Sequence, residues 1–333
     1  MANATIRDVA RQAHVSVASV SRVLNGREVV SEETRERVIA AVKALGYVPH
    51  AGARSLSLAR THAIGVALPD LHGEFFSEIV RGMDAEARAR GYLLILSNLH
   101  SGSGLQASAL RAMRGRVDGL VVMAPHLSAD ELAAVLPPGL PAVLVNTSVS
   151  ADGHPAIHLD NGAGAAAVAD HLAGLGRRRI VYIGGPKGNI DAEQRVAAFT
   201  EALGRYPDVE VETVAGDFTQ ESGEAATDAL LKSGHRFEAL FAANDDMAIG
   251  AMQVLRRAGL RVPEDVAVAG FDDIPLARHV GLTTVRVRIA ELGAKALARL
   301  FTMLEQRAEV PAHELHSPEL VVRSTTGDGG SEQ

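Results

Sequence analysis

Cysteine is absent from this sequence of 333 residues, which excludes disulfide bonds, thiolate metal sites and a cysteine nucleophile. The sequence also lacks any run of the roughly 18 consecutive apolar residues that are needed to span a bilayer. Its first residues, MANATIRDVARQ, contain no apolar segment of the kind found in signal peptides. We therefore expect a cytoplasmic protein. No HExxH motif occurs, and we expect neither a metal nor a cofactor.

Strong compositional bias is absent as well. Hydrophobic residues make up 47% of the chain and charged residues 22%, with 32 glycines and 13 prolines, as in soluble proteins that bury a large core. This composition excludes disorder, collagen and coiled coil as the main architecture. Because a domain usually holds about 100 to 200 residues, the length predicts two or three domains.

The net charge of −7 is unevenly distributed along the chain. Residues 1–60 hold nine Arg or Lys against five Asp or Glu, a balance of +4, whereas the remaining residues have a balance of −11. A basic segment on an acidic body indicates that the segment alone meets a polyanion, although a balance of +4 is also common on solvated surfaces.

Residues 1–26 predict two short helices. Thr5 is the expected N-cap of a helix that begins at Ile6, with Asp8 in the capping-box position. After a break at residues 14–16, Ser16 can cap a second helix over residues 17–25. Two short helices joined by a tight break form the helix-turn-helix pattern, in which the second helix lies in the major groove of DNA.

A third helix is expected from Ser31 to Leu45, ended by Gly46. Its predicted buried residues are Val38, Ile39, Val42 and Leu45. The following run of residues 51–59 is compatible with a helix but contains Gly52, and isolated helices shorter than about 12 residues are marginal in water. We expect this segment to be a linker that is helical only when something holds it.

From residue 62 onward, apolar runs alternate with helical segments. The first group covers residues 63–70, 92–98, 119–125 and 142–148, a further run covers residues 156–161, and the second group covers residues 179–185, 209–217, 239–245 and 265–273. Two successive groups of four β-α units predict two parallel sheets flanked by helices, an α/β architecture. Ligands bind such sheets beyond the carboxyl ends of the strands. Polar residues stand at those ends, namely Asp70, Asn98, Asn146, Asp217, Asn244 and Asp272.

Four segments of the chain resemble the lactose-repressor/galactose-repressor (LacI) family of bacterial transcription regulators. They are TIRDVARQAHVSVASVSRVLNG, GYVPHAGARSLSLARTHAIGVALPD, NDDMAIGAMQVLRRAGLRVPEDVAVAGFDD and LTTVRVRIAELG. The resemblance implies a helix-turn-helix, a hinge helix and a two-lobed core similar to periplasmic sugar-binding proteins. It also implies a nucleoid-associated homodimer, with repression the expected activity, on a pseudo-palindromic operator. An effector between the lobes, expected to be a carbohydrate, would control its operator affinity.

The resemblance implies the following domain boundaries. The helix-turn-helix domain covers residues 1–46, and the hinge covers residues 47–60. The N-terminal lobe of the core covers residues 61–160 and 289–316, and the C-terminal lobe covers residues 161–288 and 317–328. Residues 329–333 form a disordered tail.

Within the expected DNA-binding helix, Val17, Ala18 and Arg22 match family positions that read base edges. Arg22 can donate two hydrogen bonds to guanine, and small apolar side chains can touch a thymine methyl group. Other matching polar residues suit phosphate contacts or local structure. They are Thr5, Ser16, Ser21 and Asn25. The alternative is that Arg22 is only a surface cation.

In the hinge, Leu56 matches the family position that inserts into the minor groove and kinks DNA. The alternative is a leucine packed against the core. The sequence departs from the family pattern at His50, where the family commonly has Asn, and at Gly52, where it commonly has Leu. These departures put the minor-groove contacts and the folding of the hinge in question.

Nine residues match family positions around the effector. They are Phe75, Phe76, Asn146, Thr147, Asp191, Arg195, Phe218, Asn244 and Asp272. Carboxylate, amide and guanidinium groups around an aromatic ring suit a polyol, because its hydroxyls donate and accept hydrogen bonds while its CH face covers the ring. The alternative for Asn244 and Asp272 is that they cap the helices that follow them.

Two other function classes compete with this interpretation. A solute-binding protein would share the two-lobed core but has no use for a basic helical head. An NAD-linked oxidoreductase would need a dinucleotide site, and NGAGAAA at residues 161–167 partly fits the glycine fingerprint. The next apolar run, RIVYIGG, ends without the acidic residue that binds a ribose, so we expect no enzyme.

Overall fold

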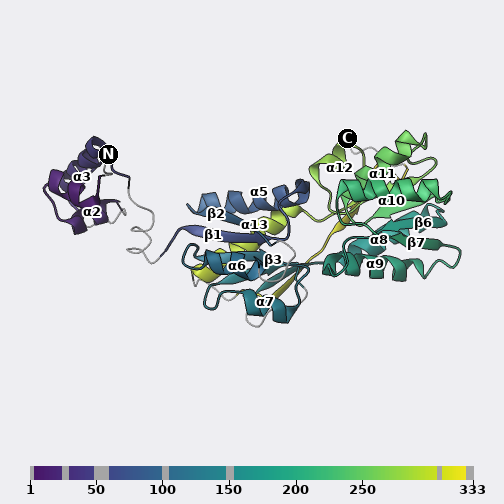
Figure 1. The fold of residues 1–333 in the computed structure, drawn as a ribbon, viewed down its shortest axis with the longest axis horizontal. Helices are drawn as coiled ribbons and strands as arrows, with labels where there is room; N and C mark the ends of the chain where they lie inside the picture. Colours follow the sequence, from purple (N-terminus) through teal and green to yellow (C-terminus); the bar gives the residue numbers. More distant parts are fainter. Residues whose placement is uncertain are drawn as a thin grey trace. The chain divides into compact units, whose positions relative to one another are not determined.

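The computed structural model describes residues 4–24, 30–48, 60–99, 105–147, 154–305 and 310–327 (Figure 1). The chain forms two compact units, Met1–Thr61 and His62–Gln333, called here the head and the core. Three residues predicted to contact DNA lie outside the described residues, as does the predicted tail. They are Asn25, His50 and Leu56. No helix in the described ranges is long and apolar enough to cross a membrane.

The described part of the head contains the three predicted helices. They are α1 (Ile6–Gln12), α2 (Val17–Leu24) and α3 (Glu32–Leu45). The predicted capping box is present at α1, where Asp8 N donates to Thr5 Oγ1 at 3.4 Å and Thr5 N donates to Asp8 Oδ2 at 3.0 Å. Ser31 caps α3 by accepting from Thr34 N, and Gly46 ends it in the left-handed conformation that glycine tolerates best.

Small apolar side chains fill the interior of the head. The buried ones are Val9, Ala10, Ala13, Val20, Val23, Val38 and Ala41. The prediction for Ile39 was wrong, because its side chain is 54% exposed and Ala41 takes the buried position. Ile39 lies about 100° around the helix from Val38, whereas Ala41 is three residues from Val38 and shares its face.

The first lobe of the core is built on a parallel six-stranded sheet in the order β11-β5-β4-β3-β1-β2. Its strands are β1 (Ala63–Leu68), β2 (Leu93–Asn98), β3 (Gly119–Met123), β4 (Ala142–Val145), β5 (Ala156–Leu159) and β11 (His313–His316). The expected grouping of four and four was therefore too small for this lobe. β11 has no apolar run, because it is an edge strand whose sequence HELH is only partly buried.

Helices cover both faces of this sheet. They are α5 (Gly73–Ala89) and α13 (Ile289–Leu304) on one face, with α6 (Leu105–Met113) and α7 (Ala129–Val135) on the other. The alternation of side chains along β1 shows the division, because Ile64 and Val66 pack with the α5 side while Ala63 and Ala67 pack with the α6 side. Every residue of β1 is buried, as expected for a parallel strand between helical layers.

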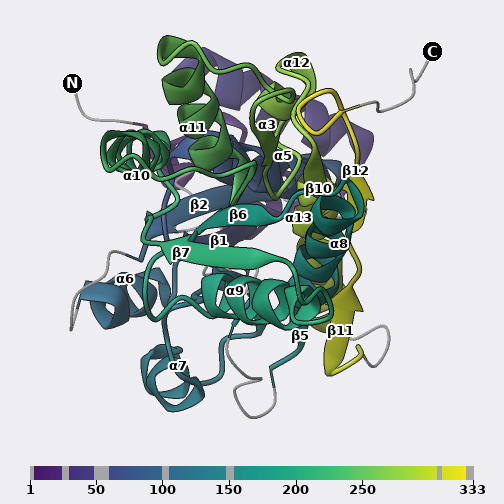
Figure 2. The same cartoon turned by 90° about the vertical axis from the view of Figure 1, so that its right-hand side faces the viewer.

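The second lobe contains a parallel four-stranded sheet in the order β7-β6-β8-β9. Its strands are β6 (Arg179–Ile183), β7 (Glu210–Val214), β8 (Ala239–Ala242) and β9 (Ala267–Ala269), and its helices are α8 (Asn161–Gly174), α9 (Ile190–Leu203), α10 (Gln220–Lys232), α11 (Asp245–Arg257) and α12 (Pro275–His279). Figure 2 shows α8 and α9 on one side of the sheet and α10 and α11 on the other. An antiparallel pair, β10 (Thr284–Arg286) and β12 (Glu319–Val321), completes this lobe.

The chain passes between the two lobes three times. Asp160 connects β5 to α8, residues 287–288 connect β10 to α13, and residues 317–318 connect β11 to β12. α13 therefore packs on α5 in the first lobe, although it follows the second lobe in sequence. These three adjacent connections form the interlobe hinge, which is distinct from the hinge segment predicted at residues 47–60. The two lobes can change their relative orientation about it.

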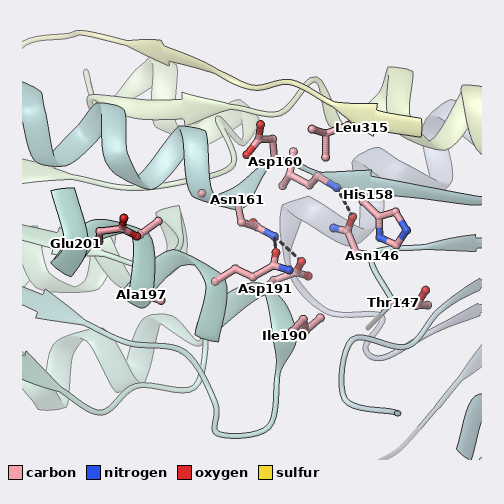
Figure 3. Close-up of a pocket in the computed structure, with 14 residues that line it drawn as sticks. Asn146, Thr147, His158, Asp160, Asn161, Ile190, Asp191, Ala197, Glu201 and Leu315 are labelled. Carbon is pink, nitrogen blue, oxygen red and sulfur yellow. Dashed lines mark hydrogen bonds between the residues drawn. The ribbon is translucent and has the colours of Figure 1, made fainter. Parts of the chain in front are cut away.

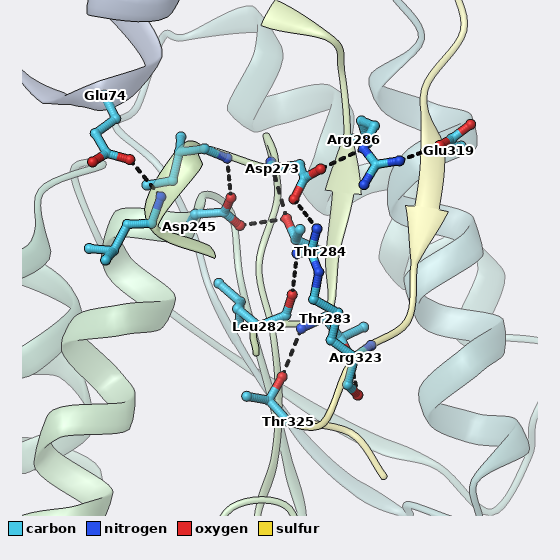
Figure 4. A network of polar contacts seen from close by, with 12 residues as sticks. Glu74, Asp245, Asp273, Leu282, Thr283, Thr284, Arg286, Glu319, Arg323 and Thr325 are labelled. Carbon is cyan, nitrogen blue, oxygen red and sulfur yellow. Dashed lines mark hydrogen bonds and ion pairs between the residues drawn. The ribbon is translucent and has the colours of Figure 1, made fainter. Parts of the chain in front are cut away.

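A buried carboxylate fixes the elements that carry the second lobe's strand ends. Asp245, the first residue of α11, accepts hydrogen bonds from Thr284 Oγ1 on β10 and, at 2.9 Å, from Ile274 N before α12 (Figure 4). Burial, and next the charge of nearby Asp272, raise the pKa of Asp245 well above its usual value. The carboxyl group therefore ties α11, α12 and β10 together directly behind Asp272.

Candidate functional site

In the head, α2 presents one apolar and one polar face. Val20 and Val23 are buried, whereas Val17, Ala18 and Arg22 are exposed, with 42% of Val17 accessible. Ala18 and Arg22 are neighbours on the helix surface because they are four residues apart, and Val17 is exposed next to Ala18 in the chain. The residues predicted to read base edges are thus displayed together.

Two of the predicted phosphate contacts also cap helices. Ser16 Oγ accepts from Ser19 N at 3.1 Å at the start of α2, and Thr5 caps α1 as described above. Their side chains therefore hold local structure, while both residues stay exposed. Ser21 is half-buried on α2.

A cavity of about 460 Å³ lies between the two lobes of the core. Strand ends and helix starts from both lobes line it, as expected for parallel sheets. Seven of the nine predicted effector residues are brought together here, namely Phe75, Phe76, Asp191, Arg195, Phe218, Asn244 and Asp272.

Arg195 lies on α9 and is held by groups from across the second lobe. Its Nε donates to Asn161 Oδ1 at 2.8 Å, and its Nη1 donates to the carbonyl oxygen of Ala243 at 2.6 Å. The guanidinium carbon lies 3.8 Å from the centre of the Phe271 ring, a cation–π contact that further restricts its position. The guanidinium is therefore preorganised rather than free to follow a ligand.

Asp272 faces this guanidinium and is itself buried. Its Oδ1 lies 3.5 Å from Arg195 Nη2, which is an ion-pair distance, but accepts no hydrogen bond. Burial raises the pKa of Asp272 to about 7; Arg195 opposes this effect, whereas Asp246 and Asp191 add to it. A buried acceptor without a hydrogen bond is costly, so this oxygen marks a place where a ligand donor gains free energy.

The capping alternative holds for Asn244 and fails for Asp272. Asn244 Oδ1 accepts from Met247 N at 3.1 Å and so caps α11, while its Nδ2 donates to the carbonyl oxygen of Phe218 at 2.9 Å. Asn244 thereby fixes the backbone of the aromatic residue. Asp272 caps no helix, because α12 begins after Ile274, whose N–H is bound by Asp245.

Backbone strain gathers at the predicted effector residues. Phe218, Asp272 and Asn146 all adopt positive φ values, of 73°, 115° and 46°. This region is unfavourable for residues other than glycine, and above all for a bulky one such as phenylalanine, at a cost of about 1 to 3 kcal/mol each. Such conformations persist where surrounding structure enforces them, and they are common at ligand sites.

The first lobe contributes two aromatic rings to the cavity. Phe75 and Phe76 lie in the first turn of α5, with ring centres 5.3 Å apart in an edge-to-face arrangement. Phe218 lines the same cavity from the second lobe, so aromatic side chains are present on both sides. An aromatic surface can cover the CH face of a sugar or the flat face of a base.

Asn146 and Thr147 do not line this cavity. Together with His158 they border a second cavity, of about 410 Å³, beside the hinge (Figure 3). Asn146 Oδ1 accepts from Leu159 N at 3.0 Å and supports the end of β5. Asp191 borders both cavities, so it lies between Asn146 and Thr147 on one side and the residues of the larger cavity on the other.

Sequence reasoning missed Asn161, which borders the second cavity and hydrogen-bonds to Asp191 and Arg195 of the larger one. Its Nδ2 donates to Asp191 Oδ1 at 2.7 Å and to Gln194 Oε1 at 3.0 Å, while its Oδ1 accepts from Arg195. Asn161 is the first residue of NGAGAAA, which was considered only as a dinucleotide fingerprint. Asp246 was also missed, although it lies two residues after the strand-end residue Asn244, and it lines the larger cavity.

The lobes touch each other at the rim of the larger cavity. Glu74 Oε2 on α5 accepts from Leu276 N at the start of α12, at 2.8 Å (Figure 4). Ile190 N at the start of α9 donates to the carbonyl oxygen of Pro125, at 3.0 Å. These two hydrogen bonds depend on the relative orientation of the lobes.

Comparison with known proteins identifies the family. A family model described as "Bacterial regulatory proteins, lacI family" matches residues 5–50, and one described as "Periplasmic binding protein-like domain" matches residues 169–326. The ribose operon repressor of Halalkalibacterium halodurans is 35% identical over 334 residues, which cover 98% of each chain. The chain belongs to the lacI family of bacterial regulatory proteins.

Other members of the lacI family support this assignment. The HTH-type transcriptional repressor PurR of Salmonella paratyphi B is 36% identical over 337 residues, covering 98% of each chain. The structure of the lac repressor dimer bound to operator and the anti-inducer ONPF has a TM-score of 0.87 and 32% identity, covering 98% of this chain and 100% of that chain. The structure of a CelR–cellobiose complex has a TM-score of 0.68 and 31% identity, covering 97% of this chain and 99% of that chain. These relatives are named as regulators and not as enzymes.

Proposed function

We propose that this lacI-family protein is a dimeric transcriptional repressor whose affinity for a pseudo-palindromic operator is controlled by a small polyhydroxyl effector in the larger core cavity. The observation that carries the effector site is the pair Arg195 and Asp272, with a buried carboxylate oxygen that accepts no hydrogen bond. A hydroxyl group can donate to this oxygen and accept from the adjacent guanidinium.

The head supports the DNA-binding half of the proposal. The exposed face of α2, with Val17, Ala18 and Arg22, has the size and chemistry to contact base edges in a major groove. One such helix offers few base contacts, so a dimer on two half-sites supplies the affinity and the specificity. A repressor of this kind acts on the chromosome, in the cytoplasm and at the nucleoid.

The hinge between the lobes supports the control of DNA binding. A ligand that touches Phe75 on one lobe and Arg195 on the other favours one relative orientation of the lobes. The hydrogen bonds of Glu74 and Ile190 across the rim form or break with that orientation. By linkage, the effector changes operator affinity only by its preference for one state, typically about 1 to 3 kcal/mol.

The names of two relatives favour a sugar as the effector. One relative is a ribose operon repressor, and a solved relative is a CelR–cellobiose complex. The polar floor of this cavity and its aromatic sides match that class. In this proposal the effector site comprises the seven predicted residues of the larger cavity, with Asn161 as a positioning residue.

The experiment is an operator titration of purified full-length protein by fluorescence anisotropy, using genomic fragments selected by gel shift and a panel of sugars and nucleosides. We expect Arg195→Ala and Asp272→Ala to bind operator normally but to lose the response to the active compound. Removing a charged partner from a buried site costs about 1.5 to 3 kcal/mol, roughly a ten- to hundredfold loss of effector affinity.

Lys232→Ala is the matched control, because Lys232 lies on α10 away from the cavity and pairs with Asp228. It should respond like the wild type. Full responsiveness of both cavity variants would show that the effector binds elsewhere. Absence of sequence-specific DNA binding by the wild type would overturn the repressor assignment itself.

A further inference from the structure

The larger cavity has a marked excess of acidic side chains. Its lining carboxylates are Asp70, Asp191, Asp217, Glu221, Asp246 and Asp272, whereas its permanently cationic residues are Lys187 and Arg195. All of these residues belong to the described part of the chain. Among the described residues that line the cavity, acidic side chains therefore outnumber permanently cationic ones.

The two cations do little to offset this excess. Arg195 already donates to Asn161 and to the carbonyl oxygen of Ala243, and it reaches Asp272 only at 3.5 Å. Lys187 is exposed in the loop before α9, where solvent and salt screen its charge. Among the described residues, neither cation forms an ion pair with Asp246 or Glu221.

Besides Asp191 and Asp272, the remaining four acids fall into two groups. Asp70 and Asp217 at the strand ends accept local hydrogen bonds, from His72 N and Thr219 Oγ1 respectively, so their positions are explained by loop structure. Asp246 and Glu221 lie in the first turns of α11 and α10, and within the described ranges they form no ion pair.

Asp246 is surrounded by like charge. Burial raises its pKa, and the carboxylates of Glu74 and Glu221 raise it further. Independently of Asp246, the buried Oδ1 of Asp272 accepts no hydrogen bond in the same cavity. Asp272 therefore lacks a hydrogen-bond donor and Asp246 lacks a nearby positive charge, and a ligand that brings either is stabilised.

We propose that Asp246 and Glu221 form a charge filter at this cavity, so that amine-bearing polyols bind best, neutral ones next, and sugar acids, sugar phosphates and nucleotides are excluded. The inference rests on the proposed effector site and adds the charge class of its ligand. Repulsion of an anion is stronger at half-buried Asp246 than at exposed Glu221, where solvent screens the charge. An anion would also have to lose its hydration, while Arg195 is already hydrogen-bonded and paired with Asp272 and Lys187 is exposed to solvent.

The test uses series of related compounds that carry different charges. Binding to the full-length protein is measured by thermal shift and calorimetry for glucosamine, glucose, gluconate and glucose 6-phosphate, for ribose and ribose 5-phosphate, and for adenosine and AMP. In each series that binds, we expect the anion to bind at least about tenfold more weakly than its neutral parent. The difference in affinity should shrink as salt is raised from 50 to 500 mM, because the screening length becomes roughly threefold shorter.

Asp246→Asn combined with Glu221→Gln should remove most of the discrimination between neutral and anionic compounds. Asp228→Asn, which neutralises a carboxylate on the outer surface of α10, is the control and should leave the discrimination unchanged. Circular dichroism and operator binding verify that each variant is folded, and they also report separately on the repressor assignment.

Three results would overturn the charge filter. They are an anion that binds as tightly as its neutral parent, discrimination that survives in the double variant, and no binding by any neutral or amine-bearing compound. If operator binding is intact in these cases, the repressor function stands and only the ligand class is wrong.

Discussion

At the scale of single residues, Arg195 and Asp272 show how the proposed effector site is organised in the absence of a ligand. The guanidinium is fixed by Asn161 and by the Phe271 ring, while the carboxyl group opposite it is buried and short of donors. The strained backbone at Asp272 and Phe218 adds to this picture, because the fold maintains conformations that these residues disfavour on their own.

The pKa of Asp272, raised by burial to about 7, predicts proton-linked effector binding. The free site is largely protonated below pH 7, whereas a hydroxyl or ammonium donor favours the charged carboxylate. Binding therefore releases a proton, and affinity should rise by about tenfold from pH 6 to pH 8. Calorimetry in buffers of different ionisation enthalpy measures both effects, and Asp272→Asn should abolish the dependence. Affinity that falls over this range would contradict the prediction.

The same pKa shift makes a prediction about folding. Because the folded-state pKa lies above the unfolded value of about 3.9, this carboxyl group stabilises the unliganded protein most at low pH. The contribution decreases as pH rises towards 7. The free energy of unfolding of the wild type should therefore fall between pH 5 and pH 8. Denaturant titrations should show a smaller fall for Asp272→Asn, which lacks this titrating group. An identical pH profile for both proteins would rule this out.

Arg22 is the residue on α2 for which we predict a specific base contact. Arg22→Ala should weaken binding by about 1 to 3 kcal/mol per half-site on the preferred operator and relax discrimination at one symmetric guanine. The salt dependence of nonspecific binding should hardly change. Anisotropy titrations of operator variants measure both quantities. An equal loss of affinity on every sequence would instead mark Arg22 as a phosphate contact.

At the scale of elements, the first lobe depends on a close approach of α5 and α13. A Cβ at Gly82 would lie 1.9 Å from the carbonyl oxygen of Ala290, and one at Gly293 would lie 2.2 Å from that of Ile79. The two helices therefore contact each other through glycines on both sides. Larger residues would force the helices apart and disturb the packing of α13 on the sheet.

We predict that Gly293→Ala destabilises the core by about 1 to 3 kcal/mol, because the overpacking outweighs the roughly 1 kcal/mol gain in helix propensity. Gly174→Ala is the matched control at the end of α8, where an added Cβ meets nothing within 4 Å. The control should be neutral or slightly stabilising. Urea unfolding followed by circular dichroism provides the comparison, and equal stabilities of the two variants would refute the close-contact argument.

At the scale of the whole molecule, the six-stranded sheet has two edges of different character. β2 forms one edge and exposes apolar residues, with Leu93 73% and Leu96 43% accessible. β11 forms the opposite edge and contributes one such residue, Leu315, at 60%. Clusters of exposed apolar side chains mark protein interfaces, so we expect β2 to contact the second copy in the dimer.

Leu96→Glu should therefore weaken the dimer and reduce operator affinity by at least tenfold, because two linked heads bind far better than one. Leu315→Glu at the opposite edge is the control and should remain dimeric. Sizing with light scattering, together with footprinting, measures both outcomes. A Leu96→Glu protein that stays dimeric would place the interface elsewhere, and a monomer with full affinity for one half-site would contradict dimeric binding altogether.

The sequence by itself determined the parts of this protein that depend on neighbours a few residues apart. Thr5 with Asp8 and Ser16 with Ser19 specify where α1 and α2 begin, and continuous apolar runs specify most of the strands. The motifs of the family extended this local information to the helix-turn-helix and the two-lobed core. Polar residues at strand ends then pointed to one side of each parallel sheet.

Only the tertiary structure decided which of these residues meet. It moved Asn146 and Thr147 to a second cavity, placed Asn161 against Arg195, paired β11 with β5, and left Ile39 exposed. Burial, the charge of Asp272 and the connection of lobes are set by groups far apart in the chain. A residue's own sequence neighbours carry no information about which distant side chain will cover it, so these properties are fixed only when the chain has packed.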